Sequence, residues 1–264
     1  MVNVKKYNLV LKYFVLILTL LVSGINCSAQ FSVTQIEGKQ INVNEKANSL
    51  AEYNVYIAPY RNRINDDLDN VLAICPETLD KSKGKWQTTI GDLLADITLL
   101  KANPVFKKRE NLDIDICILN HGGIRSILPV GNVTTRTAFE IMPFENTTIV
   151  VALKGEQIAE FATYFVAGKK PHPIAGITFT IDNQNKVKDI KVNNSPLDLG
   201  KTYHVITSDY LSNGGDNMEF FKKGLKLYDL NYKLRNILID YFKDVDIIPV
   251  SKIVKVTTEE SAEK

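Results

Sequence analysis

The stretch Asp113–Arg125 reads DIDICILNHGGIR, and its character changes half-way along. Its first part alternates charged and apolar residues and then becomes wholly apolar up to Leu119, a pattern that predicts a strand running into a buried core. Its second part, Asn120–Arg125, is a loop with two glycines, an amide and an arginine. We therefore regard this loop as a candidate binding segment at the end of a buried strand.

The residue types in this loop suit a polar ligand. Gly122 and Gly123 permit backbone conformations closed to other residues and let a ligand approach closely. Asn120 offers both a donor and an acceptor, and Arg125 offers a planar cationic fork that matches phosphate or a hydroxyl-rich ligand. Taken alone, the segment is equally compatible with a tight turn that carries a surface arginine.

Two more loops combine aromatic and polar residues. Met142–Asn146 carries Phe144, whose ring either packs in the core or stacks on a flat ligand. Tyr210–Asp216 reads YLSNGGD, with the glycines Gly214 and Gly215. Its carboxylate, Asp216, can accept hydrogen bonds from both hydroxyls of a ribose, although a strand-to-helix turn capped by Asp216 would have the same sequence.

Hydrophobic periodicity around these loops predicts one α+β domain, since the chain has no repeat, low-complexity block or linker. We expect helices over Leu50–Val71 with a kink or break at Pro59, from Thr88 or Thr89 to a point before Pro104, and over Thr135–Ile141, Glu156–Val166 and Leu230–Phe242. We expect strands over Leu72–Cys75, Thr147–Leu153, Ile177–Ile181, Val187–Val192, Thr202–Thr207 and Val245–Val250, the third and fourth forming a hairpin.

The first 29 residues have the order of a secretory signal peptide. Three lysines precede an apolar run, Tyr13–Val22, and small residues follow at Cys27-Ser28-Ala29. We expect cleavage after Ala29 and export, most simply to a periplasm, with no stable membrane span because the apolar run is short. Lipoprotein processing at Cys27 and an uncleaved anchor are the two alternatives.

Processing at Ala29 would leave 235 residues and change the net charge from +2 to −1, because the leader holds three lysines and no acid. A near-neutral chain gives no reason to expect a nucleic-acid partner. We divide the rest into an extended lead-in (30–47), the domain (48–256) and a disordered tail (257–264). Cys75 and Cys117 lie in apolar runs and are expected to be buried free thiols, although export permits a disulfide.

Taken together, the three loops resemble a known set of motifs. Asn120–Arg125, Pro143-Phe144 and Asn213–Asp216 are similar, in order and approximate spacing, to the C-terminal domain of the 5'-nucleotidase family and of related nucleotide-sugar hydrolases. Two further segments with counterparts there are Ile90–Asp96 and Lys154-Gly155. The resemblance covers about Leu50 to Phe221 and implies a single domain of mixed β-sheets flanked by helices, in α/β/β/α layers.

The resemblance also implies roles for single residues. Phe144 and Tyr210 match two aromatic residues that sandwich the nucleobase, the second of which is more often Phe. Asn120 matches a base contact, Arg125 a contact on the ribose or phosphate side, and Asp216 the residue that holds the ribose hydroxyls. Gly122, Gly123, Gly214 and Gly215 complete the expected substrate-binding set. The sequence departs from the family where Lys83-Gly84-Lys85 stands in place of a further arginine.

Hydrolysis in that family uses a two-metal site in its N-terminal domain, which includes Asp-x-His and Asn-His-Glu segments. This sequence contains neither segment, and its histidines, His121, His172 and His204, are widely spaced. We therefore expect no catalytic residue, metal or cofactor in this chain. Three functions remain open: the recognition half of an enzyme whose metals sit in a separately encoded metallophosphatase, a stand-alone nucleoside or nucleotide binder, and a degenerate member with a structural role.

Overall fold

The computed structural model describes residues 4–23, 33, 35–44 and 50–259. The chain divides into two compact units, Met1–Asn54 and Val55–Lys264. The first unit contains α1 (Val4–Ser23) and the first turn of α2 (Ala51–Leu68), and residues 35–44 carry neither helix nor strand. Among the described residues, no helix combines the length and the apolar character needed to cross a membrane. Cys27 and the expected cleavage point at Ala29 lie outside the described residues, so the signal peptide stays a prediction.

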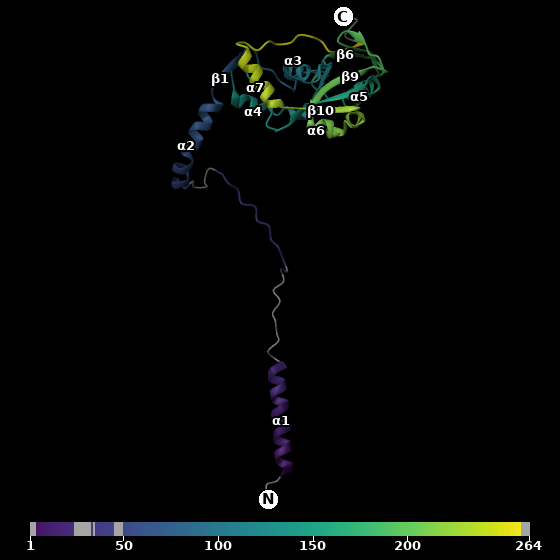
Figure 1. The fold of residues 1–264 in the computed structure, drawn as a ribbon. Coiled ribbons are helices and arrows are strands. Elements are labelled where there is room, and N and C mark those ends of the chain that lie inside the picture. The colour runs from purple at the N-terminus through teal and green to yellow at the C-terminus, as the bar shows by residue number, and fades with distance from the viewer. Residues whose placement is uncertain (1–3, 24–32, 34, 45–49, 260–264) are drawn as a thin grey trace. The chain divides into compact units, whose positions relative to one another are not determined.

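The second unit is built on three β-sheets with helices against them (Figure 1). Besides the rest of α2, its α-helices are α3 (Thr89–Glu110), α4 (Thr135–Ile141), α5 (Gly155–Gly168), α6 (Asp209–Ser212) and α7 (Leu234–Asp244). Its strands are β1 (Val71–Cys75), β2 (Ile116–Ile118), β3 (Gly131–Thr134), β4 (Thr147–Lys154), β5 (Ile174–Ala175), β6 (Ile177–Ile181), β7 (Val187–Val192), β8 (Ser195–Pro196), β9 (Thr202–Ser208), β10 (Lys226–Lys233) and β11 (Val256–Thr258).

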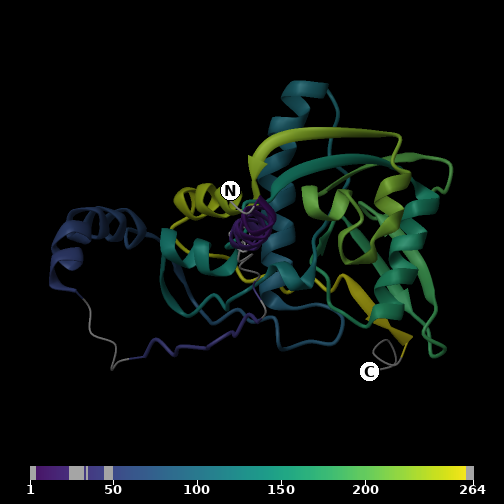
Figure 2. The same ribbon diagram turned by 90° about the horizontal axis from the view of Figure 1, so that it is seen from below.

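The five-stranded sheet, in the order β10-β4-β9-β2-β5, is the centre of this unit. Its long strands β4 and β10 run side by side (Figure 2). Alternate side chains of each central strand enter two different cores, which is the period-2 alternation of a sheet buried on both faces. On β4, Val150 joins the core that contains α3 and α7, whereas Val151 joins the core that contains α5, β6 and β7. The α+β class, with mixed sheets flanked by helices, is therefore confirmed.

Several predicted elements form where we expected them. Helix α4 has the predicted bounds, and Thr134 caps it by accepting a hydrogen bond from the Thr137 main chain. Thr88 caps α3 in the same way through Gly91. The β6–β7 hairpin forms, and Cys75 and Cys117 are buried free thiols.

The prediction that the helix begun at Thr89 stops before Pro104 is wrong. Helix α3 continues through Pro104 to Glu110 and ends at Asn111, which adopts a left-handed conformation. A proline inside a helix costs about 3 kcal/mol, but Ala102 and Phe106 on either side are fully buried. Their burial offsets that cost. Helix α2 likewise continues through Pro59, and none of its residues is buried.

The C-terminal part differs more from the prediction. Leu230–Lys233 belongs to strand β10, which pairs with β4 at Lys226–Asp229 and, after a shift in register, again at Lys233. Helix α7 starts only at Leu234. Val245–Val250 is not a strand; its one bridge joins Ile247 to Ile74. Thr257 and Thr258, expected in a disordered tail, form β11 with Val256 and pair in parallel with β6, while 260–264 lie outside the described residues.

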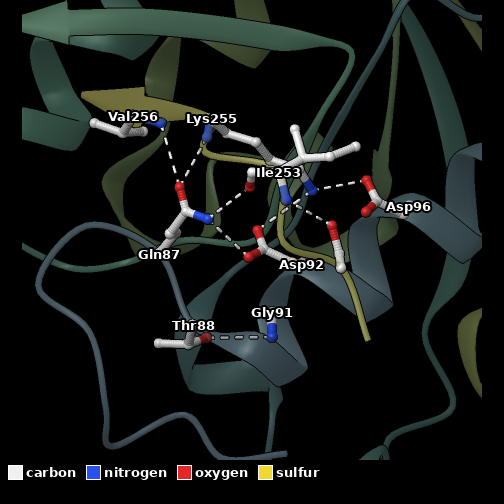
Figure 3. Close-up of polar contacts among 9 residues, drawn as sticks. Gln87, Thr88, Gly91, Asp92, Asp96, Ile253, Lys255 and Val256 are labelled. Carbon is white, nitrogen blue, oxygen red and sulfur yellow. Dashed lines mark hydrogen bonds and ion pairs between the residues drawn. The ribbon is translucent and has the colours of Figure 1, made fainter. Parts of the chain in front are cut away.

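A polar cluster of Gln87, Asp92, Asp96 and Lys255 connects the start of β11 to the start of α3 (Figure 3). The ammonium group of Lys255 lies 2.7 Å from Asp96 Oδ1 and 3.3 Å from Asp92 Oδ1. Gln87 joins the same cluster, because its amide donates to Asp92 and its carbonyl oxygen accepts from the main chain of Lys255. Burial raises the pKa of the Asp92 carboxyl, and the charge of Lys255 opposes that rise. The charge of Lys255 thus offsets part of the cost of ionising Asp92 in the core.

Replacing Lys255 by Met keeps most of the apolar stem and removes the cation from Asp92. We expect Lys255→Met to lower the free energy of unfolding by about 3 kcal/mol, as when one partner of a buried ion pair is removed. Urea denaturation followed by circular dichroism measures the change. Lys252 is exposed, so the control Lys252→Met should change stability by less than about 0.5 kcal/mol. Equal losses in the two variants would contradict the role given to Lys255.

Candidate functional site

One edge of the five-stranded sheet brings the three predicted loops together. Strands β2 and β9 are parallel, with Ile116 opposite Val205, so the loops that follow them leave at the same edge. Strand β4 is antiparallel to β9, with Thr148 opposite Ser208, so the loop that precedes β4 arrives there as well. The register of the sheet therefore places Asn120–Arg125, Met142–Asn146 and Tyr210–Asp216 side by side.

These loops enclose a cavity of about 600 Å³, within the range of about 300–1,000 Å³ typical of small-molecule sites. The side chains and backbone that line it are Asn120, Gly122, Gly123, Arg125, Phe144, Glu145, Asn146, Asp209, Tyr210 and Asp216. Seven of the nine predicted substrate-binding residues are thus in one cavity. The two that do not line it are Gly214 and Gly215.

Phe144 and Tyr210 are the two rings of the cavity, and both are unusually exposed for aromatic residues. Phe144 is 45% exposed and Tyr210 46% exposed. They belong to different segments, since Phe144 lies in the loop before β4 and Tyr210 in helix α6 directly after β9. Exposed rings inside a cavity leave apolar faces free to stack on a planar ligand.

Asp216 connects two of the loops through hydrogen bonds. Its Oδ1 accepts from the Tyr210 hydroxyl at 2.8 Å, and its Oδ2 accepts from the Asn120 side-chain amide at 3.1 Å. Its main-chain N–H donates to the Tyr210 oxygen at 3.1 Å, and its carbonyl accepts from the hydroxyl of Tyr164. The hydroxyl that Tyr210 carries in place of a more usual Phe therefore has a partner, and that bond raises the pKa of Tyr210.

The glycines of these loops are required more because neighbouring atoms leave no room for a Cβ than because of unusual backbone angles. Gly122 and Gly123 do not have the positive φ that we expected to need glycine. At Gly123, however, a Cβ would lie 2.8 Å from Asn120 Oδ1. Gly214 has a φ of 85°, and a Cβ at Gly215 would lie 2.6 Å from the Tyr210 ring. Gly214 and Gly215 therefore shape the turn behind Tyr210.

The guanidinium group of Arg125 lies over the Phe144 ring, with its carbon 5.7 Å from the centre of that ring. The lysines that stand where the family has an arginine do not line the cavity. Lys85 lies over Trp86, at 5.3 Å from its ring centre. Nearby Lys81 reaches the Asn120 loop, because its ammonium group donates to the carbonyl of Ile124 at 2.5 Å.

His172, which lies between two prolines, is hydrogen-bonded to the Asn120 loop. It is 3% exposed, and its Nδ1 accepts a hydrogen bond from the main-chain N–H of His121. Burial lowers the pKa of the His172 imidazole to about 4, although the charge of Asp216 acts in the opposite direction. The neutral ring is the form that can accept this bond.

The comparison with known families fits this geometry. The family model described as "5'-nucleotidase, C-terminal domain" matches residues 71–223, more than half of the chain. The chain belongs to this family. Phe144, Tyr210 and the other lining residues all lie inside the matched span.

Similar proteins are longer than this 5'-nucleotidase C-terminal domain. The trifunctional nucleotide phosphoesterase protein YfkN of Bacillus subtilis is 31% identical over 173 residues, 60% of this chain but 11% of that protein. The silent protein UshA(0) of Salmonella typhimurium is 29% identical over 168 residues, 61% of this chain and 28% of that protein. The chain thus spans less than a third of the length of these curated relatives.

The fold is shared with solved structures. The 5'-nucleotidase precursor from Thermus thermophilus superposes with a TM-score of 0.66 at 23% identity, covering 76% of this chain and 42% of that one. The NAD nucleotidase of Haemophilus influenzae superposes with a TM-score of 0.55 at 19% identity, covering 79% of this chain and 42% of that one. These likenesses concern the fold.

Glu145, Asn146 and Asp209 also line the cavity of this 5'-nucleotidase C-terminal domain, and they were not among the predicted binding residues. The Asn146 amide donates to Asp209 Oδ1 at 2.7 Å, which ties the loop before β4 to the start of α6. In the sequence they lie close to Phe144 and Tyr210, and this is the one feature that could have identified them as lining residues. Among the described residues, no group of three His, Cys, Asp or Glu side chains is arranged to hold a metal ion.

The low pKa of His172 gives a prediction for the acid range. Unfolded His172 takes up a proton below about pH 6.5, whereas folded His172 does so only near pH 4. Its contribution is therefore fully present above about pH 6.5 and is lost as the pH falls toward 4, with about 2 kcal/mol lost by pH 5. We expect urea unfolding at pH 7 and pH 5 to show this loss in the wild type. The variant His172→Gln should show a loss smaller by that amount; the same loss in both proteins would contradict the prediction.

Proposed function

We propose that this chain is the nucleotide- or nucleoside-recognition subunit of an exported, split 5'-nucleotidase. The observation that carries the proposal is the single cavity that holds two half-exposed rings, Phe144 and Tyr210, together with Asp216, Asn120 and Arg125. Stacking of a base on an aromatic ring contributes about 1–3 kcal/mol. A nucleobase would lie against the two rings, with Asn120 beside its edge.

The polar residues suit the rest of a nucleotide. A carboxylate has about four lone-pair sites, and the bonds from Tyr210 and Asn120 use one on each oxygen of Asp216. The remaining sites can accept bonds from the two hydroxyls of a ribose. The exposed Arg125 supplies a cation at the cavity for the sugar or phosphate side.

Hydrolysis would need metal ligands from outside this sequence. This sequence has no Asp-x-His or Asn-His-Glu segment, and the described residues hold no metal-binding cluster. We propose that a separately encoded metallophosphatase supplies the divalent metals and that the pair releases phosphate from nucleotides. The signal-peptide pattern of the first 29 residues supports export, with the periplasm as the proposed compartment and a lipid anchor at Cys27 as the alternative.

Calorimetry with adenosine and AMP tests the cavity. We expect both ligands to bind the wild-type chain, and Phe144→Ala and Tyr210→Ala each to weaken binding by 1–3 kcal/mol, about 5- to 150-fold. Tyr60, which is 62% exposed on α2 and not part of the cavity, gives the control Tyr60→Ala. Absence of binding, or equal effects of all three substitutions, would remove the proposed recognition function.

Reconstitution tests the division into two chains. We expect the isolated chain to release no phosphate from AMP, and a metallophosphatase encoded beside it to do so efficiently only when the two are mixed. Phosphate release is measured colorimetrically, and Phe144→Ala in the mixture should raise KM because the base loses a stacking face. If the chain binds AMP but changes the activity of no such phosphatase, it is a stand-alone binder and the subunit proposal fails.

A further inference from the structure

The loop that carries Phe144 is hydrogen-bonded to residues that lie C-terminal to the span matched by the family model. The junction of β10 and α7 lies beyond residue 223, where the match ends. Because Lys233 of β10 pairs with Thr147 of β4, this junction reaches the same edge of the sheet as the cavity. The main-chain N–H of Leu234 donates to the carbonyl of Asn146 at 3.1 Å, which fixes the end of the loop.

Arg235 makes the most extensive contacts with this loop. Its guanidinium donates to the carbonyls of Met142 at 3.4 Å and Pro143 at 3.2 Å, and it forms an ion pair with the carboxylate of Glu145. Phe144 is the one residue between these partners. A planar fork can bond groups on both sides of a residue at once, whereas a lysine ammonium is a point charge.

The surroundings of Arg235 restrict it further. The residue is only 5% exposed, and its guanidinium carbon lies 3.9 Å from the centre of the Phe139 ring. A buried charge needs partners for its donors, and the two carbonyls and Glu145 provide them. Lys233 also pairs with Glu145, so this carboxylate receives two cations from the same junction.

We propose that Arg235 is a positioning residue that holds the Phe144 ring in the orientation required for stacking. The proposal rests on the recognition function above and makes the junction of β10 and α7 a part of the binding site. Arg235 does not line the cavity, so it acts through the loop and not by touching the ligand. Its loss should weaken the contact with the base and spare the contacts with sugar and phosphate.

The primary test is Arg235→Lys, which keeps the charge and loses the fork. We expect it to weaken adenosine binding about tenfold, which corresponds to about 1.4 kcal/mol of stacking. Binding of ribose 5-phosphate, which has no base, should stay within twofold of the wild type. In a Phe144→Ala background, Arg235→Lys should have no further effect on adenosine, because the ring that it positions is gone.

Arg109 provides a matched control. Its guanidinium also donates to two main-chain carbonyls, those of Asp229 and Leu230, but these lie on β10 and away from the cavity. Arg109→Lys should leave the affinities for both ligands unchanged. If Arg235→Lys does not fold, Glu145→Gln breaks the ion pair at a 60% exposed side chain. Glu145 itself lines the cavity, so only the part of its effect on adenosine that vanishes in the Phe144→Ala background reports on the position of the ring. If no part of the effect vanishes there, the positioning role is overturned.

A ligand-free measurement separates this proposal from the proposed function. A 4-fluorophenylalanine at position 144 should give one sharp fluorine NMR signal in the wild type and a broadened or split signal in Arg235→Lys. If that change is seen but the wild type binds no adenosine, the recognition function fails while the positioning of the ring stands. If adenosine binds and Arg235→Lys leaves it unchanged, or weakens ribose 5-phosphate equally, the positioning role is overturned and the recognition function stands.

Discussion

Burial of both faces of the five-stranded sheet is the constraint on which the site depends. All three residues of β2 are buried, as are six of the eight on β4, and they supply both cores. Such strands have no free face on which to carry polar chemistry, so it has to lie where they begin or end. The pairing of β2, β4, β9 and β10 puts four of these ends at one edge, and the cavity is at that edge.

The three loops could be found from the sequence because each has a local signal. Glycines and polar residues interrupt an apolar run at Asn120 and again after Ser208, and Pro143-Phe144 precedes the β-branched run of β4. The resemblance to the family then assigned roles that no local pattern contains. That these loops share one cavity is a property of strand register, which depends on pairing between residues about 90 apart.

Contacts between residues far apart in the chain could not be predicted from the local sequence. His172 reaches the Asn120 loop from 51 positions away, and Lys255 reaches Gln87 from 168 away. Leu230 was predicted to be helical because it continues the apolar spacing of Leu234 and Ile237. It is 1% exposed in the same core as those two residues, but it lies in strand β10. The spacing of apolar residues predicts which side chains are buried in one core. It does not show whether each of them belongs to a helix or to a strand.

The bond between Tyr210 and Asp216 has a consequence for how the cavity works. With phenylalanine at position 210, the ring and the Asp216 carboxylate would have no side-chain hydrogen bond between them. Here the hydroxyl of the ring is fixed by the same carboxylate that also holds Asn120. A ligand that hydrogen-bonds to Asp216 therefore affects, at the same time, the bond from the Tyr210 hydroxyl and the bond from the Asn120 amide. In a hydrogen-bonded network of this kind the contributions of Tyr210, Asn120 and Asp216 are coupled, and single substitutions at these residues will not add up.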